Sequence, residues 1–242
     1  MNPIESIKKI FFKNKSKYER ETDFWKNEIN NYVRWYQGEL KTHYSTPSPQ
    51  EEKKVKVHNI SHSAVLTWLK LHQEVKYIED LQLEKTAFSG MRVLDVGSGP
   101  FPSAMVFEGC KLYCLDPLLP QYIKAGFPLH YYEGVKFVYG FSENIPVENN
   151  FFDAVISVNS IDHVDNIYMT SLAIKRVLKP GGKIRIHAHY HKKTATEPLE
   201  LSDNVMSKAF NWCDGFKKIR ESREKKGSVA GADEVFALWS NF

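Results

Sequence analysis

From Met91 to Tyr190 the chain alternates short apolar runs with helical stretches, and this alternation constrains the fold more than any other feature of the sequence. The apolar runs have the length and residue types of strands, and they occupy residues 91–96, 111–116, 135–140, 152–158 and 183–190. Strands that alternate with helices predict a parallel sheet with helices on both faces. We therefore expect an α/β, Rossmann-like fold.

Two further apolar runs, 216–222 and 234–241, follow a predicted helix over residues 203–213. The segment between them, KKGSVAGAD, contains two glycines, which suits a reversal of the chain. These runs predict a terminal antiparallel strand pair, which completes a seven-stranded sheet.

Helical patterns precede the alternating part of the chain. Residues 20–40 carry aromatic and aliphatic side chains at helical intervals, and a second pattern runs from about Val57 to Leu81. The stretch KTHYSTPSP separates the two patterns. We expect an N-terminal helical extension or cap over residues 1–85 and the main α/β domain over residues 86–242.

Composition places the chain among globular proteins. Its 242 residues are 42% hydrophobic and 26% charged, which is enough apolar material for a core. No apolar run approaches the 18 or so residues that cross a bilayer, and no secretory signal is evident, so we expect a cytoplasmic protein. The three cysteines lack the close spacing of a zinc or redox pair.

The net charge of +4 comes entirely from the first twenty residues, which hold six Lys or Arg against two Glu. There, apolar side chains recur at roughly helical spacing among lysines, a pattern that can rest on an anionic membrane surface. A solvated terminal helix or tail is the expected form, because so short a stretch buries little apolar area. The balanced remainder of the chain offers no basic stripe for nucleic acid.

The segment VLDVGSGP, residues 93–100, places a glycine loop directly after an apolar strand and before a helix predicted to begin near Pro102 or Ser103. Two glycines let the backbone turn sharply and approach a ligand closely. A second strand, KLYCLD, ends in Asp116 about twenty residues later, where an acid can accept hydrogen bonds from both hydroxyls of a ribose. The order of strand, loop, helix and acid predicts a nucleotide site.

Two ligands suit this frame, a dinucleotide such as NAD and S-adenosylmethionine. The dinucleotide pattern needs a third glycine where this chain has Pro102, because the pyrophosphate approaches the helix N-terminus closely. S-adenosylmethionine has no phosphate, and loop amides and an acid such as Asp95 can hold its amino-acid end. Pro102 therefore favours S-adenosylmethionine over NAD.

VLDVGSGP resembles motif I of class I S-adenosylmethionine-dependent methyltransferases, and YCLDP resembles their ribose-binding segment. GFSENIPVENNFFDAVISVNSIDHV and LKPGGKIRI resemble later motifs of type 11-like members, in the same order along the chain. The likeness spans roughly residues 91–190 and implies an enzyme that transfers a methyl group from S-adenosylmethionine. The residues so assigned to the cofactor are Asp95, Gly97, Ser98, Gly99, Asp116, Pro117, Phe141, Ser142, Glu143 and Asn159.

The chain departs from this family pattern at two positions. Phe101 stands where members often have a small residue, and Phe141 stands where an acid often follows strand three. We expect Phe141 to pack on the adenine, with Ser142, Glu143 or the backbone there replacing the missing acid.

Histidines are the candidate bases. Methyl transfer from a sulfonium depends mainly on in-line positioning, and a base is needed only when the acceptor is a hydroxyl. A base should lie just beyond the carboxyl end of a strand, because ligands bind there. His163, in the segment after the strand predicted over residues 152–158, is therefore the first candidate. His189 and His191 come next, because they lie nearer the outlet of their strand than His187.

His187, His189 and His191 occupy alternate positions, so in a strand their side chains share one face. Neighbouring members of the three are then about 6.6 Å apart. A metal ion bound there would need a third ligand, for which Asp162 and His163 are available. A lone His-x-His pattern is weak support for a metal site. We therefore expect no metal, and histidines that act as a base or as hydrogen-bond donors.

Three functions remain open. The first is O-methylation of a small molecule or sugar, by general likeness in the synthesis of bacterial surface polysaccharides or secondary metabolites. The second is a nicotinamide-dependent oxidoreductase, which Pro102 opposes, and the third is a non-catalytic methyltransferase-fold protein that serves as an interaction partner. The expected partner is a small-molecule or sugar acceptor, and the sequence does not define an oligomeric state.

Overall fold

The computed structural model describes residues 16–40, 59–224 and 234–242. The predictions made for most of the basic N-terminal segment and for the turn KKGSVAGAD lie outside these residues. In the described part of the chain, no helix is long and apolar enough to cross a membrane.

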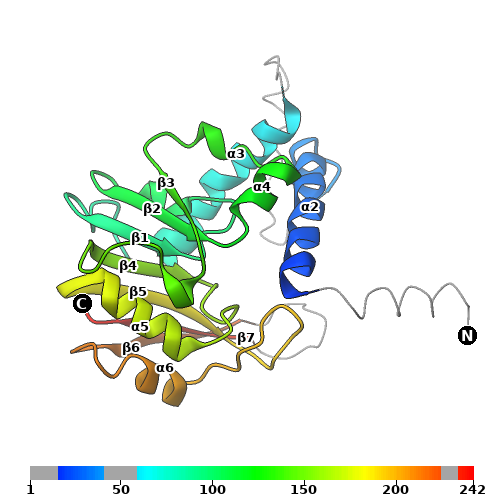
Figure 1. Ribbon diagram of the computed structural model, residues 1–242. Coiled ribbons are helices and arrows are strands. Elements are labelled where there is room, and N and C mark those ends of the chain that lie inside the picture. The colour runs from blue at the N-terminus through cyan, green and yellow to red at the C-terminus, as the bar shows by residue number, and fades with distance from the viewer. Residues whose placement is uncertain (1–15, 41–58, 225–233) are drawn as a thin grey trace, which may run out of the picture.

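A seven-stranded sheet forms the centre of the molecule, in the order β3-β2-β1-β4-β5-β7-β6 (Figure 1). β1 to β5 are parallel, whereas β7 pairs antiparallel with both β5 and β6. The strands are β1 (Arg92–Val96), β2 (Lys111–Asp116), β3 (Lys136–Tyr139), β4 (Phe152–Val158), β5 (Leu178–Tyr190), β6 (Lys217–Glu224) and β7 (Glu234–Ser240). The predicted α/β class and the terminal antiparallel pair are confirmed.

Helices cover both faces of the sheet. α5 (Ile167–Val177) and α6 (Asp203–Ala209) share one apolar cluster with the sheet, which includes Leu94, Val155 and Ile184. On the other face, a second cluster joins the strands to η2 (Gln73–Glu79), a π-helix, and to η3 (Ser103–Val106). Because β4 lies between the two layers, six of its seven residues are buried.

A third layer consists of α2 (Lys17–Tyr36), α3 (Ile60–His72) and α4 (Leu119–Ala125). α2 begins with a capping box, in which Ser16 Oγ accepts a hydrogen bond from the Glu19 amide and the Glu19 carboxylate accepts one from the Ser16 amide. Its apolar side packs on α3, where Tyr32 stacks on Trp68 with ring centroids 5.0 Å apart. α2 and α3 belong to the stretch predicted as an N-terminal extension or cap, whereas α4 comes from the main α/β part of the chain, and the division into two parts stays a prediction.

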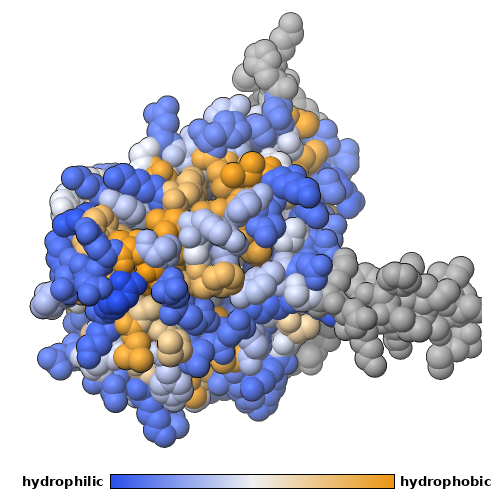
Figure 2. Space-filling view, in the orientation of Figure 1, coloured by the Kyte–Doolittle hydropathy of each residue, from blue (hydrophilic) through white to orange (hydrophobic). Residues whose placement is uncertain are grey.

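Short 3-10 helices, η4 (Leu129–Tyr131) and η5 (Ser142–Asn144), complete the connections. The helix predicted after the glycine loop begins at Ser103 as expected, but it is the four-residue 3-10 helix η3 and not an α-helix. The face seen in Figure 2 is largely hydrophilic, with apolar side chains gathered in its middle and upper part.

Candidate active site

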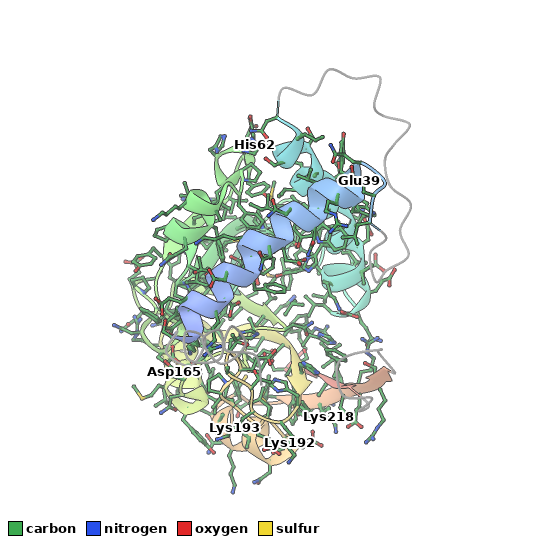
Figure 3. All side chains as sticks on the ribbon, turned by 90° about the vertical axis from the view of Figure 1, so that its right-hand side faces the viewer. Glu39, His62, Asp165, Lys192, Lys193 and Lys218 are labelled. Carbon is green, nitrogen blue, oxygen red and sulfur yellow. The ribbon has the colours of Figure 1, made fainter. Side chains whose placement is uncertain are left out.

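A cavity of about 600 Å³ lies at the carboxyl ends of the parallel strands, which is the place where open α/β sheets bind ligands. α2 covers this edge of the sheet: in Figure 3 it runs across the molecule, from near Asp165 towards Glu39. Lys17, Tyr18, Glu21 and Trp25 of α2 line the cavity. Its volume is within the usual range of small-molecule sites.

The glycine loop forms one wall of the cavity. Gly97 and Gly99 have φ values of 72° and 62°, in the left-handed region that glycine adopts without strain. A Cβ on Gly97 would lie 2.4 Å from Ser160 Cβ, so the close approach of these two segments also requires glycine. Ser160 Oγ donates to the Val96 carbonyl at 2.7 Å and fixes the loop against the segment after β4.

Asp116 ends β2 beside this loop, and its carboxylate is buried at the cavity wall. Its Oδ2 accepts from the Gly99 amide at 2.9 Å and its Oδ1 accepts from the Leu118 amide at 2.8 Å. The Tyr122 side chain also hydrogen-bonds this carboxylate, which can accept about four hydrogen bonds in all and so keeps a position for a ribose hydroxyl. Burial raises the pKa of Asp116 to about 6, although the two amides oppose this effect.

Asp95 was expected to hold the amino-acid end of the cofactor, but it does not line the cavity. Its side chain is fully buried, and Oδ2 accepts a hydrogen bond from the Tyr77 hydroxyl at 2.8 Å. Burial raises the pKa of Asp95 to about 7. Tyr77 itself reaches the cavity, so Asp95 acts on the site through Tyr77 and the backbone of the loop.

The remaining residues assigned to the cofactor all line the cavity, namely Pro117, Phe141, Ser142, Glu143 and Asn159. Several of them are already engaged. Glu143 Oε1 accepts from the Asp165 amide at 2.7 Å, and Asn159 Oδ1 lies 2.8 Å from His187 Nδ1. These bonds position the loops after β3 and β4 and leave the ring of Phe141, 43% exposed, free to face a ligand.

His163 also lines the cavity. Its Nδ1 lies 3.1 Å from Glu21 Oε2, and its Nε2 lies 3.8 Å from Glu197 Oε1. Burial alone would lower the pKa of His163, but the hydrogen bond to Glu21 and the nearby carboxylates outweigh burial and raise the pKa to about 9. The histidine and its carboxylate partner have the arrangement of a base and the group that orients it.

His189 and His191 lie behind this wall and are not part of the cavity lining. The His189 ring stacks on Phe236, with centroids 4.5 Å apart. His191 Nε2 lies 2.9 Å from Asp162 Oδ2, a contact that raises the pKa of His191 to about 9. Of the three predicted bases, His163 alone lies at the cavity within the described residues.

Reasoning from sequence missed the contribution of α2. Glu21 orients His163, the Tyr18 ring meets Phe141 edge to face, and Lys17 forms an ion pair with Asp165. Glu21 lies in the helix predicted over residues 20–40, but Lys17 and Tyr18 precede that range, because α2 begins earlier, at Lys17. Nothing in the sequence indicated which part of the sheet this helix would meet.

The sheet order and the ligand site at the glycine loop define a class I S-adenosylmethionine-dependent methyltransferase fold. Residues 94–186 match the family model described as "Methyltransferase domain". Residues 94–186 therefore belong to a methyltransferase domain, whose cofactor is S-adenosylmethionine. The left-handed glycines, the buried Asp116 carboxylate and the cavity between them suit that cofactor.

Curated relatives share the domain over about 100 residues. A sterol 24-C-methyltransferase (ERG6B) of Gibberella zeae is 36% identical over 38% of this chain and 26% of its own length. A phthiotriol/phenolphthiotriol dimycocerosates methyltransferase of Mycobacterium leprae is 32% identical over 40% of this chain and 37% of its own length. The chain thus spans less than two fifths of these relatives.

Solved structures share the fold more widely. A SAM-dependent methyltransferase from Aquifex aeolicus superposes with a TM-score of 0.51 at 19% identity, over 74% of this chain and 98% of that one. At this identity the likeness concerns the fold. The reaction is therefore inferred from the residues that line the cavity.

Proposed function

We propose that the protein transfers the methyl group of S-adenosylmethionine to a hydroxyl of a small-molecule acceptor, with His163 as the general base. The observation that carries this proposal is the presence of Asp116, the glycine loop and His163 around one cavity. Asp116 and the loop would hold the ribose and the amino-acid end of the cofactor. The acceptor would then enter between them and His163.

The reaction converts a hydroxyl and a methylsulfonium into a methyl ether and a neutral thioether, and it releases one proton. His163 is placed to accept that proton, and Glu21 would stabilise the resulting imidazolium. The positive sulfonium disfavours a second positive charge nearby, so bound cofactor would favour the neutral imidazole. Most of the rate gain would come from alignment of the acceptor with the methyl group.

The side chains that line the cavity indicate the chemical class of the methyl acceptor. Phe24, Trp25, Phe101 and Phe141 give the cavity an aromatic character, while Glu21 and Glu197 supply hydrogen-bond acceptors for hydroxyls. The relatives' names refer to a sterol and to phthiotriol compounds, which favours an acceptor with an apolar body. A sugar acceptor and a role in surface-polysaccharide or secondary-metabolite synthesis stay predictions of the sequence.

The test is incubation of the protein with methyl-labelled S-adenosylmethionine and a panel of acceptors. The panel contains sterols, long-chain diols, phenols, sugars, nucleotide sugars and amines. Transfer of label to a hydroxyl compound supports the proposal, and transfer to amines alone contradicts it. Titration with NAD in parallel tests the oxidoreductase alternative, and binding of S-adenosylmethionine without turnover on any acceptor would favour the non-catalytic alternative.

A further inference from the structure

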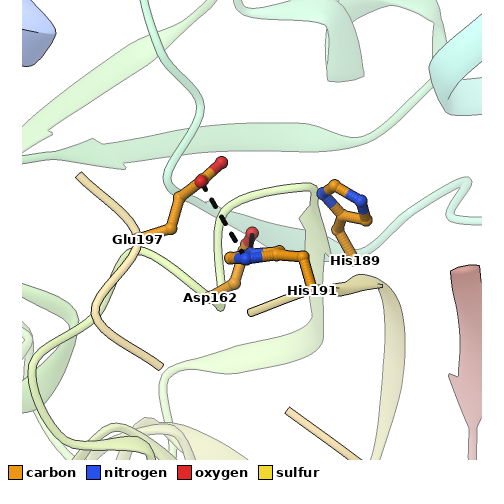
Figure 4. Close-up of side chains that lie close together, drawn as sticks. All are labelled: Asp162, His189, His191 and Glu197. Carbon is orange, nitrogen blue, oxygen red and sulfur yellow. Dashed lines mark hydrogen bonds and ion pairs between the residues drawn. The ribbon is translucent and has the colours of Figure 1, made fainter. Parts of the chain in front are cut away.

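A cluster of two histidines and two carboxylates lies behind the cavity wall, and of its four members Glu197 alone also lines the cavity. His189 and His191 come from the end of β5, Asp162 from the segment after β4, and Glu197 from the segment after β5. One potential ligand atom of each residue lies within 4.8 Å of those of the other three. Figure 4 shows the His191 imidazole beside Asp162 and Glu197, with His189 next to it.

The hydrogen bonds of His191 prepare it to be a ligand. Its Nδ1 lies 2.7 Å from the Lys192 carbonyl oxygen, which only accepts, so Nδ1 carries a hydrogen. Its Nε2 faces Asp162 Oδ2 at 2.9 Å, and a metal ion bound between the two would take the place of the Nε2 proton. A histidine that binds a metal through one nitrogen commonly donates its other N–H to a backbone carbonyl in this way.

Asp162 provides an independent indication. Its side chain is 1% exposed, and among the described residues its Oδ1 has no hydrogen-bond partner. A buried carboxylate oxygen without a partner is unfavourable, and a bound cation would satisfy it. Neither Asp162 nor Glu197 forms an ion pair with a lysine or arginine of the described chain, and their charged partners there are the imidazoles of His191 and His163.

The solvent exposure of the cluster and the orientation of Glu197 are also suited to binding an ion. The His191 side chain is 13% exposed and that of Glu197 25% exposed, so an ion can enter from solvent. Glu197 is oriented by the Thr194 hydroxyl, which donates to its Oε2 at 2.7 Å. Two imidazoles and two carboxylates are a donor set for zinc, whereas magnesium and calcium prefer oxygen ligands alone.

We propose that Asp162, His189, His191 and Glu197 form a binding site for one divalent transition-metal ion, with zinc as the favoured ion. This proposal replaces the expectation from sequence that no metal is bound, because Glu197 and the buried Asp162 supply the ligands that a lone His-x-His pattern lacks. Glu197 also lines the cavity, so an ion would fix one wall of the acceptor site.

The test uses the full chain, stripped with a chelator and titrated with zinc sulfate alone by isothermal titration calorimetry. We expect one zinc ion per chain and a higher melting temperature in its presence. His191→Asn and Glu197→Gln should each weaken zinc binding by roughly tenfold or more. Glu197→Gln changes a partly exposed loop residue, so it keeps the test valid if His191→Asn fails to fold.

Two controls separate this site from adventitious binding. Glu200→Gln makes the same change in the same loop, at a residue whose carboxylate pairs with Lys192, and it should leave zinc binding unchanged. The double substitution His62→Gln with His130→Gln removes another adjacent pair, with ring centroids 5.6 Å apart, and should also bind zinc normally.

The proposal is overturned if no zinc binds, if Glu197→Gln binds as tightly as the unmodified chain, or if only the His62 and His130 variant loses binding. Neither S-adenosylmethionine nor an acceptor is present in the titration. Failure of the metal site therefore leaves the proposed methyl transfer standing, and failure of methyl transfer leaves the zinc measurement valid.

Discussion

His163 Nδ1 lies 3.1 Å from Glu21 Oε2, so the candidate base is oriented by a residue 142 positions earlier in the chain, on α2. Because Nδ1 meets the carboxylate, Nε2 is the nitrogen that can face an acceptor. α2 therefore does more than cover the cavity. It completes the site by fixing the orientation of the imidazole.

Glu21→Gln should reduce the methyl-transfer rate at saturating cofactor by roughly tenfold or more, because the amide holds the imidazole less firmly and does not stabilise imidazolium. The measurement is kcat with the acceptor found in the labelling panel. Glu28→Gln makes the same change on the same helix, at a residue that hydrogen-bonds Asn31 and does not line the cavity, and it should leave kcat unchanged. Equal loss in both variants would indicate a general effect on α2.

His163→Ala should lower the same rate by roughly 10²-fold or more, because it removes the group placed to accept the proton. Binding of S-adenosylmethionine, followed by calorimetry, should change little. His130→Ala, at an exposed histidine outside the cavity, is the control. An unchanged rate in His163→Ala would remove the base role from this residue.

The sheet could be predicted from the sequence because each buried strand appears as a short apolar run, which is visible in a few neighbouring residues. The runs that became β1, β2 and β4 are mostly apolar, and in the fold they lie between two layers of helices. Asp116 could be placed for the same reason, since its distance from the glycine loop depends only on the repeat of strand and crossover.

Other features depend on contacts between distant segments, which no local pattern encodes. The burial of Asp95 follows from Tyr77, which arrives from η2 and donates to it. Glu197 approaches His191 only because the segment after β5 folds back over the strand end. These contacts explain why the lining role of Asp95 was overestimated and why the fourth member of the histidine cluster was missed.

Asp116→Asn should weaken S-adenosylmethionine binding by roughly 10- to 100-fold, since hydrogen bonds to a charged group contribute about 1.5–3 kcal/mol. Calorimetric titration measures the affinity, and circular dichroism checks the fold, because the carboxylate also accepts from Gly99 and Leu118. Asp214→Asn, at an exposed acid outside the cavity, should bind normally. Full affinity in a folded Asp116→Asn protein would contradict the ribose assignment.

Asp95 should make folding stability depend on pH. Its pKa is raised from 3.8 to about 7, chiefly by burial, so the folded state holds the proton more tightly than the unfolded state. Its contribution is fully present below pH 4 and is lost as the pH rises to about 7. Asp95→Asn should therefore gain stability relative to the unmodified protein across this window, by about 1 kcal/mol or more at pH 8, since one pKa unit corresponds to about 1.4 kcal/mol.

Asp153 provides a control of opposite sign for this experiment. Burial alone would raise the pKa of Asp153, but its hydrogen bonds with Lys179 and the Arg92 amide lower it. Its contribution is present above the ordinary carboxyl pKa and is lost as the pH falls. Asp153→Asn should thus be less stable than the unmodified protein at pH 7, by urea unfolding, with the difference shrinking in acid. If Asp95→Asn followed the same trend as Asp153→Asn, the Asp95 carboxylate would be stabilised in its ionised form and the assignment of its raised pKa to burial would fail.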